Sequence, residues 1–215
     1  MPTAMTFTSL KADMVAYLER GSAVDTTVYD QLPNLINNAE RRIAREAKIL
    51  GFKVPVTGTM EAGQPVVDKP ERWRSTVSIN FGTGSGFETR TPLFPRSYEY
   101  CRNFWPADAQ TSTPRYYADY DYSHWLVVPT PDQDYPFEVI FHQLPQLLDD
   151  GNQTNWITQY APDVLLYASL LEATPFLKDD ERIQTWQGLY DRALAALNAE
   201  DQTRIVDQSA VRSET

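Results

Sequence analysis

The N-terminal part of the chain has the hydrophobic spacing of two amphipathic helices. Apolar side chains share one face over about residues 8–20, and a longer stripe runs over about residues 33–50. The members of the two stripes are Leu10, Met14 and Leu18, then Leu35, Ile36, Ala39, Ile43, Ala47 and Leu50. Such a stripe is typical of a helix that buries one face. The other faces of the second helix carry Arg41, Arg42, Arg45 and Lys48.

Helical spacing returns in the last third of the chain. It predicts helices over about residues 160–174 and 179–200, separated by Pro175, because proline disrupts a helix interior. After Leu197 the apolar spacing fades. Residues 201–215 hold only three bulky apolar side chains, Ile205, Val206 and Val211. We therefore expect residues 201–215 to form an extended, flexible C-terminal arm.

Between the helical parts, short β-like runs alternate with turn signals. Eleven of the fifteen prolines lie between residues 52 and 145, together with most of the aromatic residues. The runs are 52–59, 64–67, 76–81, 116–120, 125–128 and 137–143. The last three are the clearest and predict an antiparallel meander, within a small sandwich or barrel.

Together these elements predict an α+β fold. Residues 1–51 and 146–200 are expected to form an antiparallel helical bundle, because the first and last helices pack together only if the chain returns to where it left. Residues 52–145 form an inserted antiparallel β domain, and residues 201–215 form the extended arm.

Composition narrows the classes of function. The net charge of −10 is uneven: residues 1–51 carry six basic and six acidic side chains, residues 52–145 carry eight and eleven, and residues 146–215 carry five and twelve. Tight nucleic-acid binding requires a basic footprint, which this chain lacks. No apolar run is long enough to cross a bilayer. One cysteine and two histidines exclude an internal disulfide and a structural zinc site.

Candidate chemistry in the β-rich segment has simpler explanations. Four aspartates could hold Ca²⁺, but they lack the ligand alternation of an EF-hand and are explained by turn chemistry: Asp119, Asp121, Asp132 and Asp134. A hydrolase that uses Cys101 with His142 is one alternative, although the surroundings of Cys101 match no known nucleophile setting. A second alternative is a carbohydrate- or receptor-binding tail module built on the aromatic run of residues 116–125.

The order of several short motifs resembles the head-to-tail adaptor (connector) proteins of tailed bacteriophages, and is similar to tail tubular protein A of podoviruses. The resemblance covers about residues 5–200, and each motif is short. The motifs are Leu32–Ile43, Val56–Thr59, Thr113–Ala118, Leu126–Asp132, Leu165–Ala173, Phe176–Lys178 and Trp186–Leu197.

The resemblance implies a structural virion protein at the head-tail interface, made in the host cytoplasm, and not an enzyme. It implies a homo-oligomeric ring, usually dodecameric, beneath the portal protein, with a tail nozzle or another tail protein on the distal side. Double-stranded DNA would pass through without sequence-specific binding, and no membrane, metal or cofactor is expected. The expected portal-binding residues of the arm are Arg204, Ile205, Val206, Val211 and Arg212, and the candidates for the subunit interface are Arg41, Arg42, Arg45 and Lys48.

Overall fold

The computed structural model describes residues 4–19, 26–47, 50–83, 89–176 and 181–210. Its helices are α1 (Phe7–Leu18), α2 (Thr26–Tyr29), α3 (Leu32–Glu46), α4 (Tyr98–Phe104), α5 (Trp156–Tyr160), α6 (Pro162–Glu172) and α7 (Arg182–Ala210), with short 3₁₀ turns at Leu50–Phe52 and Thr174–Phe176. Its strands are β1 (Lys53–Met60), β2 (Val66–Asp68), β3 (Trp73–Phe81), β4 (Thr91–Pro95), β5 (Tyr116–Asp119), β6 (His124–Val128) and β7 (Tyr135–Gln143). The α+β class is confirmed.

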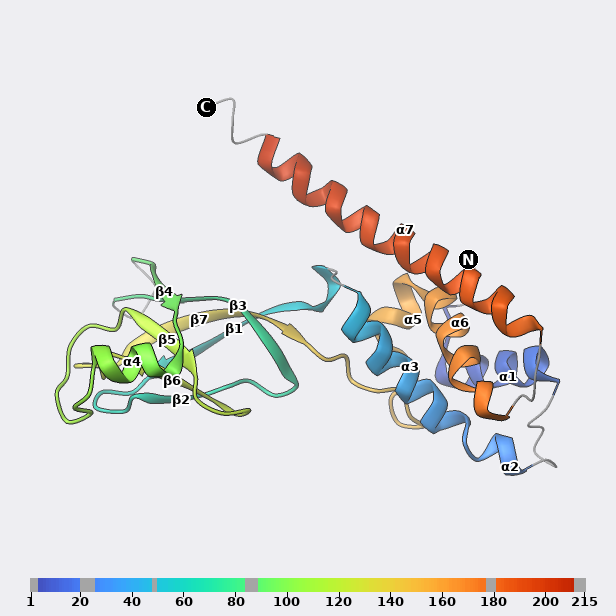
Figure 1. Ribbon diagram of the computed structural model, residues 1–215, viewed down its shortest axis with the longest axis horizontal. Helices are drawn as coiled ribbons and strands as arrows, with labels where there is room; N and C mark the ends of the chain where they lie inside the picture. The colour runs from blue at the N-terminus through green and yellow to red at the C-terminus, as the bar shows by residue number, and fades with distance from the viewer. Residues whose placement is uncertain (1–3, 20–25, 48–49, 84–88, 177–180, 211–215) are drawn as a thin grey trace. The chain divides into compact units, whose positions relative to one another are not determined.

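The chain divides into two compact units, one formed by residues 1–52 and 144–215 and the other by residues 53–143 (Figure 1). The first unit is helical, and α6 lies at its centre because it contacts α1, α3, α5 and α7. Apolar residues of α6 and of these neighbours form one buried core, which includes Phe7, Leu10, Met14, Ile36, Ile43, Leu165, Leu170, Trp186 and Tyr190. We call this part the helical unit.

Polar caps set where the helices of this unit begin. The side chain of Thr6 accepts from the backbone N–H of Ser9, whose hydroxyl oxygen accepts from the N–H of Thr6, so that α1 starts with a capping box. Asn155 caps α5 in the same way. One helix was expected over 160–174, but Ala161 leaves helical geometry and Pro162 starts α6 separately, because proline is tolerated in a first turn.

The second unit, which we call the β unit, contains a seven-stranded sheet in the order β1-β7-β3-β4-β5-β6-β2. The sheet curls into a barrel-like shape around a core that includes Met60, Phe81, Trp125, Phe137, Val139 and Phe141. The residues of β7 alternate between buried and half-buried positions, as expected for a strand with one face on the core.

The predicted meander and the purely antiparallel sheet are wrong. The pairing of β5 with β6 is antiparallel, but β7 pairs with β1 and β3 and not with β6. Strands β4 and β5 are parallel, joined by a connection that contains α4. Local turn signals do not determine which strands pair, because pairing also depends on the burial of distant residues such as Phe137 and Phe81. Neither β4 nor α4 was predicted.

The end of the last helix also differs from the prediction. An extended arm was expected from Asp201, but α7 continues to Ala210. The decisive signal is that residues 198–210 contain neither glycine nor proline, so that nothing stops the helix. At a rise of about 1.5 Å per residue, the 29 residues of α7 span about 43 Å, against about 16 Å for the 11 residues of α6. The C-terminal half of α7 therefore runs past α6 (Figure 1).

Candidate functional site

Three of the four basic residues proposed for a subunit interface lie on α3. Arg41 and Arg45 are exposed, and within the described residues no ion pair joins either of them to a carboxylate. The Nε of Arg45 donates to the backbone oxygen of Arg41 at 3.1 Å, which leaves most of both guanidinium groups accessible. Lys48 lies outside the described residues.

Arg42 is engaged within its own chain. Its Nε donates to Oε1 of Glu46 at 3.1 Å, and its Nη1 lies 3.7 Å from Oε1 of Glu172. Its guanidinium carbon lies 4.7 Å from the centre of the Tyr190 ring, and the hydroxyl of Tyr190 donates to Oε2 of Glu46 at 2.5 Å. These four residues connect α3, α6 and α7, so that the position of α7 depends on a polar cluster as well as on apolar packing. Burial, followed by the bond to Glu46, raises the pKa of Tyr190.

The five residues proposed for portal binding fall in two parts of the C-terminus. Arg204, Ile205 and Val206 lie in the distal part of α7. Val211 and Arg212 lie outside the described residues. The apolar core that we describe reaches no farther along α7 than Leu197.

A fully buried carboxyl group lies between α3 and the segment that enters α5. The backbone N–H of Leu148 donates to Oε2 of Glu40 at 3.0 Å, and Nδ2 of Asn155 donates to Oε1 at 2.5 Å. Burial raises the pKa of Glu40 to about 7, although both hydrogen bonds and the charge of Arg41 oppose the rise. Since Asn155 also caps α5, this carboxyl group couples α3 to the start of α5.

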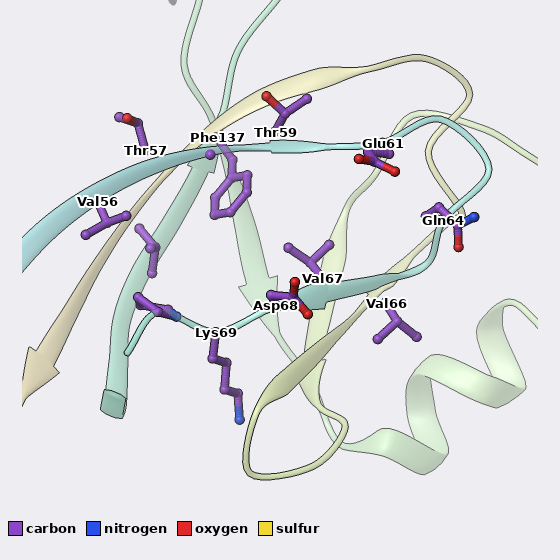
Figure 2. Close-up of a pocket in the computed structure, with 13 residues that line it drawn as sticks. Val56, Thr57, Thr59, Glu61, Gln64, Val66, Val67, Asp68, Lys69 and Phe137 are labelled. Atoms are coloured by element: carbon purple, nitrogen blue, oxygen red, sulfur yellow. The ribbon is translucent and has the colours of Figure 1, made fainter. Parts of the chain in front are cut away.

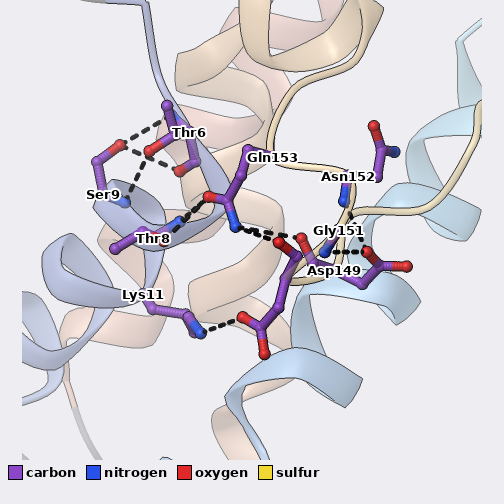
Figure 3. Close-up of polar contacts among 9 residues, drawn as sticks. Thr6, Thr8, Ser9, Lys11, Asp149, Gly151, Asn152 and Gln153 are labelled. Carbon is purple, nitrogen blue, oxygen red and sulfur yellow. Dashed lines mark hydrogen bonds and ion pairs between the residues drawn. The ribbon is translucent and has the colours of Figure 1, made fainter.

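The loop of residues 149–153 fastens the start of α1, as Figure 3 shows. The backbone N–H of Phe7 donates to the oxygen of Gln153 at 2.8 Å, and the hydroxyl of Thr8 donates to Oε1 of Gln153 at 2.9 Å. The loop itself is shaped by Asp149, whose Oδ1 accepts from the N–H groups of Gly151 and Asn152 at 2.7 Å each. This network joins segments that are far apart in the sequence, and it is a structural device and not a catalytic one.

The β unit contains a pocket of about 450 Å³ between the two edges of its sheet. Figure 2 shows Phe137 pointing into the pocket below β1, while the side chains of Thr57 and Thr59 point away. A Cβ on Gly58 would lie 2.8 Å from the Phe137 ring, so glycine is required for this close approach. The pocket is the open seam of the barrel-like sheet. Its lining is mainly apolar and includes three charged residues, Glu61, Asp68 and Lys69. Two of them make ion pairs, Lys69 with Asp119 at 2.8 Å and Asp68 with His124 at 3.2 Å.

The four aspartates considered as calcium ligands make contacts of different kinds. Asp121 accepts from the N–H groups of Ser123 and His124, at 2.6 and 2.8 Å, and the hydroxyl of Tyr135 donates to Asp132 at 2.7 Å. Asp119 instead pairs with Lys69 at 2.8 Å, and Asp134 accepts from the distant N–H of Ala62 at 2.8 Å. The bonds of Asp121 are those of a turn, as predicted, while the other three aspartates make other contacts. Across the described residues, no group of three or more His, Cys, Asp or Glu side chains is arranged to hold a metal ion.

Cys101 is a poor candidate nucleophile. Its side chain is fully buried on the inner face of α4, where it packs with Ala118, Leu126 and Val128. Burial raises the pKa of its thiol, which disfavours the reactive thiolate. His142 lies on β7, and among the described contacts no hydrogen bond links it to Cys101.

Comparison with known proteins decides the family. The model of the family described as SU10 adaptor protein matches residues 5–213, which is nearly the whole chain. The chain belongs to the SU10 adaptor protein family. Membership in this family makes it a phage structural protein of adaptor type and a component of the virion. No curated protein matches the chain.

The family assignment supports the resemblance to phage adaptor proteins that the motifs suggested. The more specific resemblance, to tail tubular protein A of podoviruses, stays a prediction. The match of the SU10 adaptor model continues beyond the short motifs and includes the whole of α7. Throughout the described part of the chain, no helix is both long enough and apolar enough to cross a membrane.

Sequence reasoning missed several residues that organise these surfaces. Glu40 was not singled out, because a single carboxylate among basic residues gives no sign of burial. Asn155 could have been found from its spacing to Thr158, since the pair forms a capping box. Ser97 is the corresponding signal for α4, because its side chain accepts from the N–H of Tyr100.

Proposed function

We propose that this SU10 adaptor family member is a head-to-tail adaptor that forms a ring beneath the portal, extends the DNA channel and provides the attachment platform for the tail nozzle. Twelve copies is the stoichiometry that we propose. The observation that carries the proposal is the family match over residues 5–213. The position in the particle, the ring and the neighbours are inferences from that membership.

The distal part of α7 is our candidate for the portal-docking element. The described core contacts of α7 end at Leu197, and the helix continues to Ala210. An amphipathic helix can dock on a partner protein, and the family match, which extends to residue 213, includes this segment. Arg204, Ile205 and Val206 lie in this segment and are proposed as portal contacts together with Val211 and Arg212.

The charge of the chain suits a wall along which DNA moves. With a net charge of −10, the chain has more acidic than basic side chains, which disfavours tight binding to phosphates through release of counterions. Like charges reduce adhesion between the wall and the passing DNA. We propose that carboxylates outnumber basic groups on the channel surface, and a density map of the virion that shows a basic channel would contradict this point.

The test is a pair of C-terminal deletions. Removal of residues 201–215 is expected to leave the core folded, because every described core residue precedes position 201. The melting temperature should therefore stay close to that of the full chain, and the circular dichroism spectrum should lose only the signal of the removed end of α7, while binding to the portal protein of the same phage is lost. Removal of residues 211–215 alone takes away Val211 and Arg212 but leaves α7 whole, so comparison of the two deletions separates the contribution of α7 from that of the last five residues.

Binding is measured by co-sedimentation with assembled portal, followed by electron microscopy of the complexes. Retained binding after removal of 201–215 would contradict the role of α7. Rings that form on a tail protein, and never on the portal, would contradict the proposed position of the adaptor.

A further inference from the structure

The sheet of the β unit ends in two edge strands that do not pair with each other. Among the described strands, β1 pairs with β7 alone and β2 pairs with β6 alone, so the sheet is open between β1 and β2. The pocket of about 450 Å³ lies in this opening, which we call the seam (Figure 2). A free sheet edge presents unpaired main-chain donors and acceptors, and it can therefore accept a further strand.

The main chain of β1 faces the seam at alternate residues. The N–H of Gly82 donates to the backbone oxygen of Pro136 at 2.9 Å, so the main chain of Pro136 points toward β3 and away from β1. Pro136 lies opposite Thr59 of β1. Thr59 is therefore a non-hydrogen-bonded position of this antiparallel pair, and so is Thr57, two residues earlier. The N–H and C=O groups of both threonines point from β1 toward the seam.

The main chain of β2 faces the seam in the same way. The N–H of Lys69 donates to the backbone oxygen of Ser123 at 2.7 Å, so the main chain of Lys69 faces β6. Neighbouring residues of a strand face opposite ways, so the main chain of Asp68 faces the seam, as does that of Val66. In the described part of the chain, no backbone hydrogen bond from another segment reaches these positions on β1 or β2.

The inner surface of the seam is apolar and incompletely covered. Val56 lies on the same face of β1 as the buried Met60, yet Val56 is 38% exposed. Phe137 and Val139 of β7 also line the pocket. An extended segment placed between β1 and β2 would cover these side chains and would also pair with the free main-chain groups on both edges.

Prolines restrict the seam to a short segment. Pro55 lies just before the part of β1 that lines the pocket, and Pro65 and Pro70 flank β2. Proline cannot donate to a ladder, so long edge-to-edge pairing between two copies of the sheet is disfavoured. At about 3.3 Å per residue, the three residues of β2 span about 10 Å, which suits an occupant of about three to five extended residues.

The rim of the seam is acidic. Three charged residues line the pocket, and one of them, Lys69, is already paired with Asp119 at 2.8 Å. Glu61 is exposed and makes no ion pair within the described residues. The side chain of Asp68 is 92% exposed, although Nε2 of His124 lies 3.2 Å from its Oδ1. Two carboxylates that face solvent are therefore available to basic side chains of an occupant.

We propose that the seam is a docking site for an extended segment of a different protein, which adds as a strand between β1 and β2 and alternates apolar with basic side chains. Alternate side chains of a strand point to opposite faces, so the apolar ones would pack on Val56 and Phe137 while the basic ones meet Asp68 and Glu61. In strand addition the main chain supplies affinity and the alternate side chains supply specificity. This site goes beyond the proposed adaptor function and depends on neither the ring nor the portal.

Other occupants match the seam less well. A small apolar ligand would leave the main-chain groups of both edges without partners, and DNA would be repelled by the carboxylates. A second copy of the chain has its described strands already paired. None of its remaining segments contains more than one basic residue; these are 1–3, 20–25, 48–49, 84–88, 177–180 and 211–215.

The first experiment measures amide hydrogen exchange in the full-length protein by NMR. In the free protein the amides of Thr57, Thr59, Val66 and Asp68 should exchange rapidly, while the amide of Val56, which faces β7, is protected. Protection of all four amides at low protein concentration would show that the edges are already covered, and would overturn the proposal. Protection that appears as the protein concentration rises would assign the seam to a second copy, and the proposed partner would be wrong.

The second experiment adds a probe, a blocked seven-residue peptide that alternates valine with lysine. Binding is followed by fluorescence anisotropy, and the peptide should slow exchange of the same four amides. A peptide with glutamate in place of lysine, and one with N-methyl groups on alternate amides, should each bind about tenfold more weakly. Equal binding of the glutamate peptide would refute a basic partner, and equal binding of the N-methylated peptide would refute strand addition. Absence of binding at millimolar peptide would overturn the proposal.

Two substitutions with matched controls test the protein side of the contact. Thr57→Pro removes an N–H that faces the seam without loss of a bond to β7, whereas Thr57→Val keeps the main chain. Glu61→Lys reverses a charge at the rim, and Glu99→Lys makes the same change at an exposed position of α4 outside the seam. Thr57→Pro and Glu61→Lys should weaken peptide binding about fivefold or more with little change in melting temperature, and the controls should bind normally. Unchanged binding by Glu61→Lys and by a folded Thr57→Pro would refute the site.

Discussion

The buried carboxyl group of Glu40 should make the stability of the helical unit depend on pH. Its pKa rises from 4.5 to about 7 in the folded chain because burial disfavours the charged form. The folded state therefore binds more protons than the unfolded state between these two values. The contribution of Glu40 to the free energy of unfolding is present in full below about pH 4.5, falls as the pH rises, and is lost above about pH 7.

The magnitude follows from the size of the shift. One pKa unit corresponds to about 1.4 kcal/mol, so a rise from 4.5 to about 7 predicts a loss of about 2–3 kcal/mol between pH 5 and pH 8. Glu40→Gln has nearly the same shape and does not ionise. Both oxygens of Glu40 accept hydrogen bonds, one from the N–H of Leu148 and one from the side-chain amide of Asn155. In the glutamine variant one of these donors faces the new NH₂ group instead of an oxygen, and the lost hydrogen bond lowers stability. That cost does not depend on the ionisation of residue 40.

The assay is urea unfolding of the original protein and of Glu40→Gln at pH 5, 6, 7 and 8. We expect the variant to be less stable at pH 5 and to improve relative to the original by about 2–3 kcal/mol at pH 8. The difference between the two proteins removes the titration of groups that they share and that do not interact with residue 40. A difference in unfolding free energy that stays constant from pH 5 to pH 8 would refute the argument.

Three other substitutions test the packing. Gly51→Ala should lower the free energy of unfolding in urea by about 2 kcal/mol or more, because the added Cβ would lie 2.2 Å from the Trp156 ring. Gly188→Ala in α7 should raise the free energy of unfolding by about 0.5–1 kcal/mol, because its Cβ meets no atom within 4 Å and alanine favours a helix over glycine. Asn155→Ala should lower the unfolding free energy by about 2 kcal/mol, since it removes a helix cap and a donor to a buried carboxyl group; a loss below 0.5 kcal/mol would contradict this. Cys101 should resist a thiol reagent in the folded protein and react only after unfolding, and rapid labelling of the native chain would show that it is accessible.

The pattern of apolar residues was sufficient to predict most elements. It placed helices near α1, α3 and α6 because each buries a stripe that recurs at helical spacing. It also located six of the seven strands, but missed β4. Only the central Leu93 of that strand is buried, so the run carries almost no periodic signal.

Pairing and long-range polar contacts were decided by tertiary structure alone. Whether β7 lies beside β6 or between β1 and β3 depends on which distant side chains share the core, and no local signal carries that information. The same holds for Glu40, whose carboxyl group is buried and has a raised pKa only when Leu148 and Asn155 close over it. The sequence by itself determined the family, the helical and β-rich segments and the acidic character of the chain. The fold decided which aromatic residues stay exposed, because exposure depends on what the rest of the chain leaves uncovered.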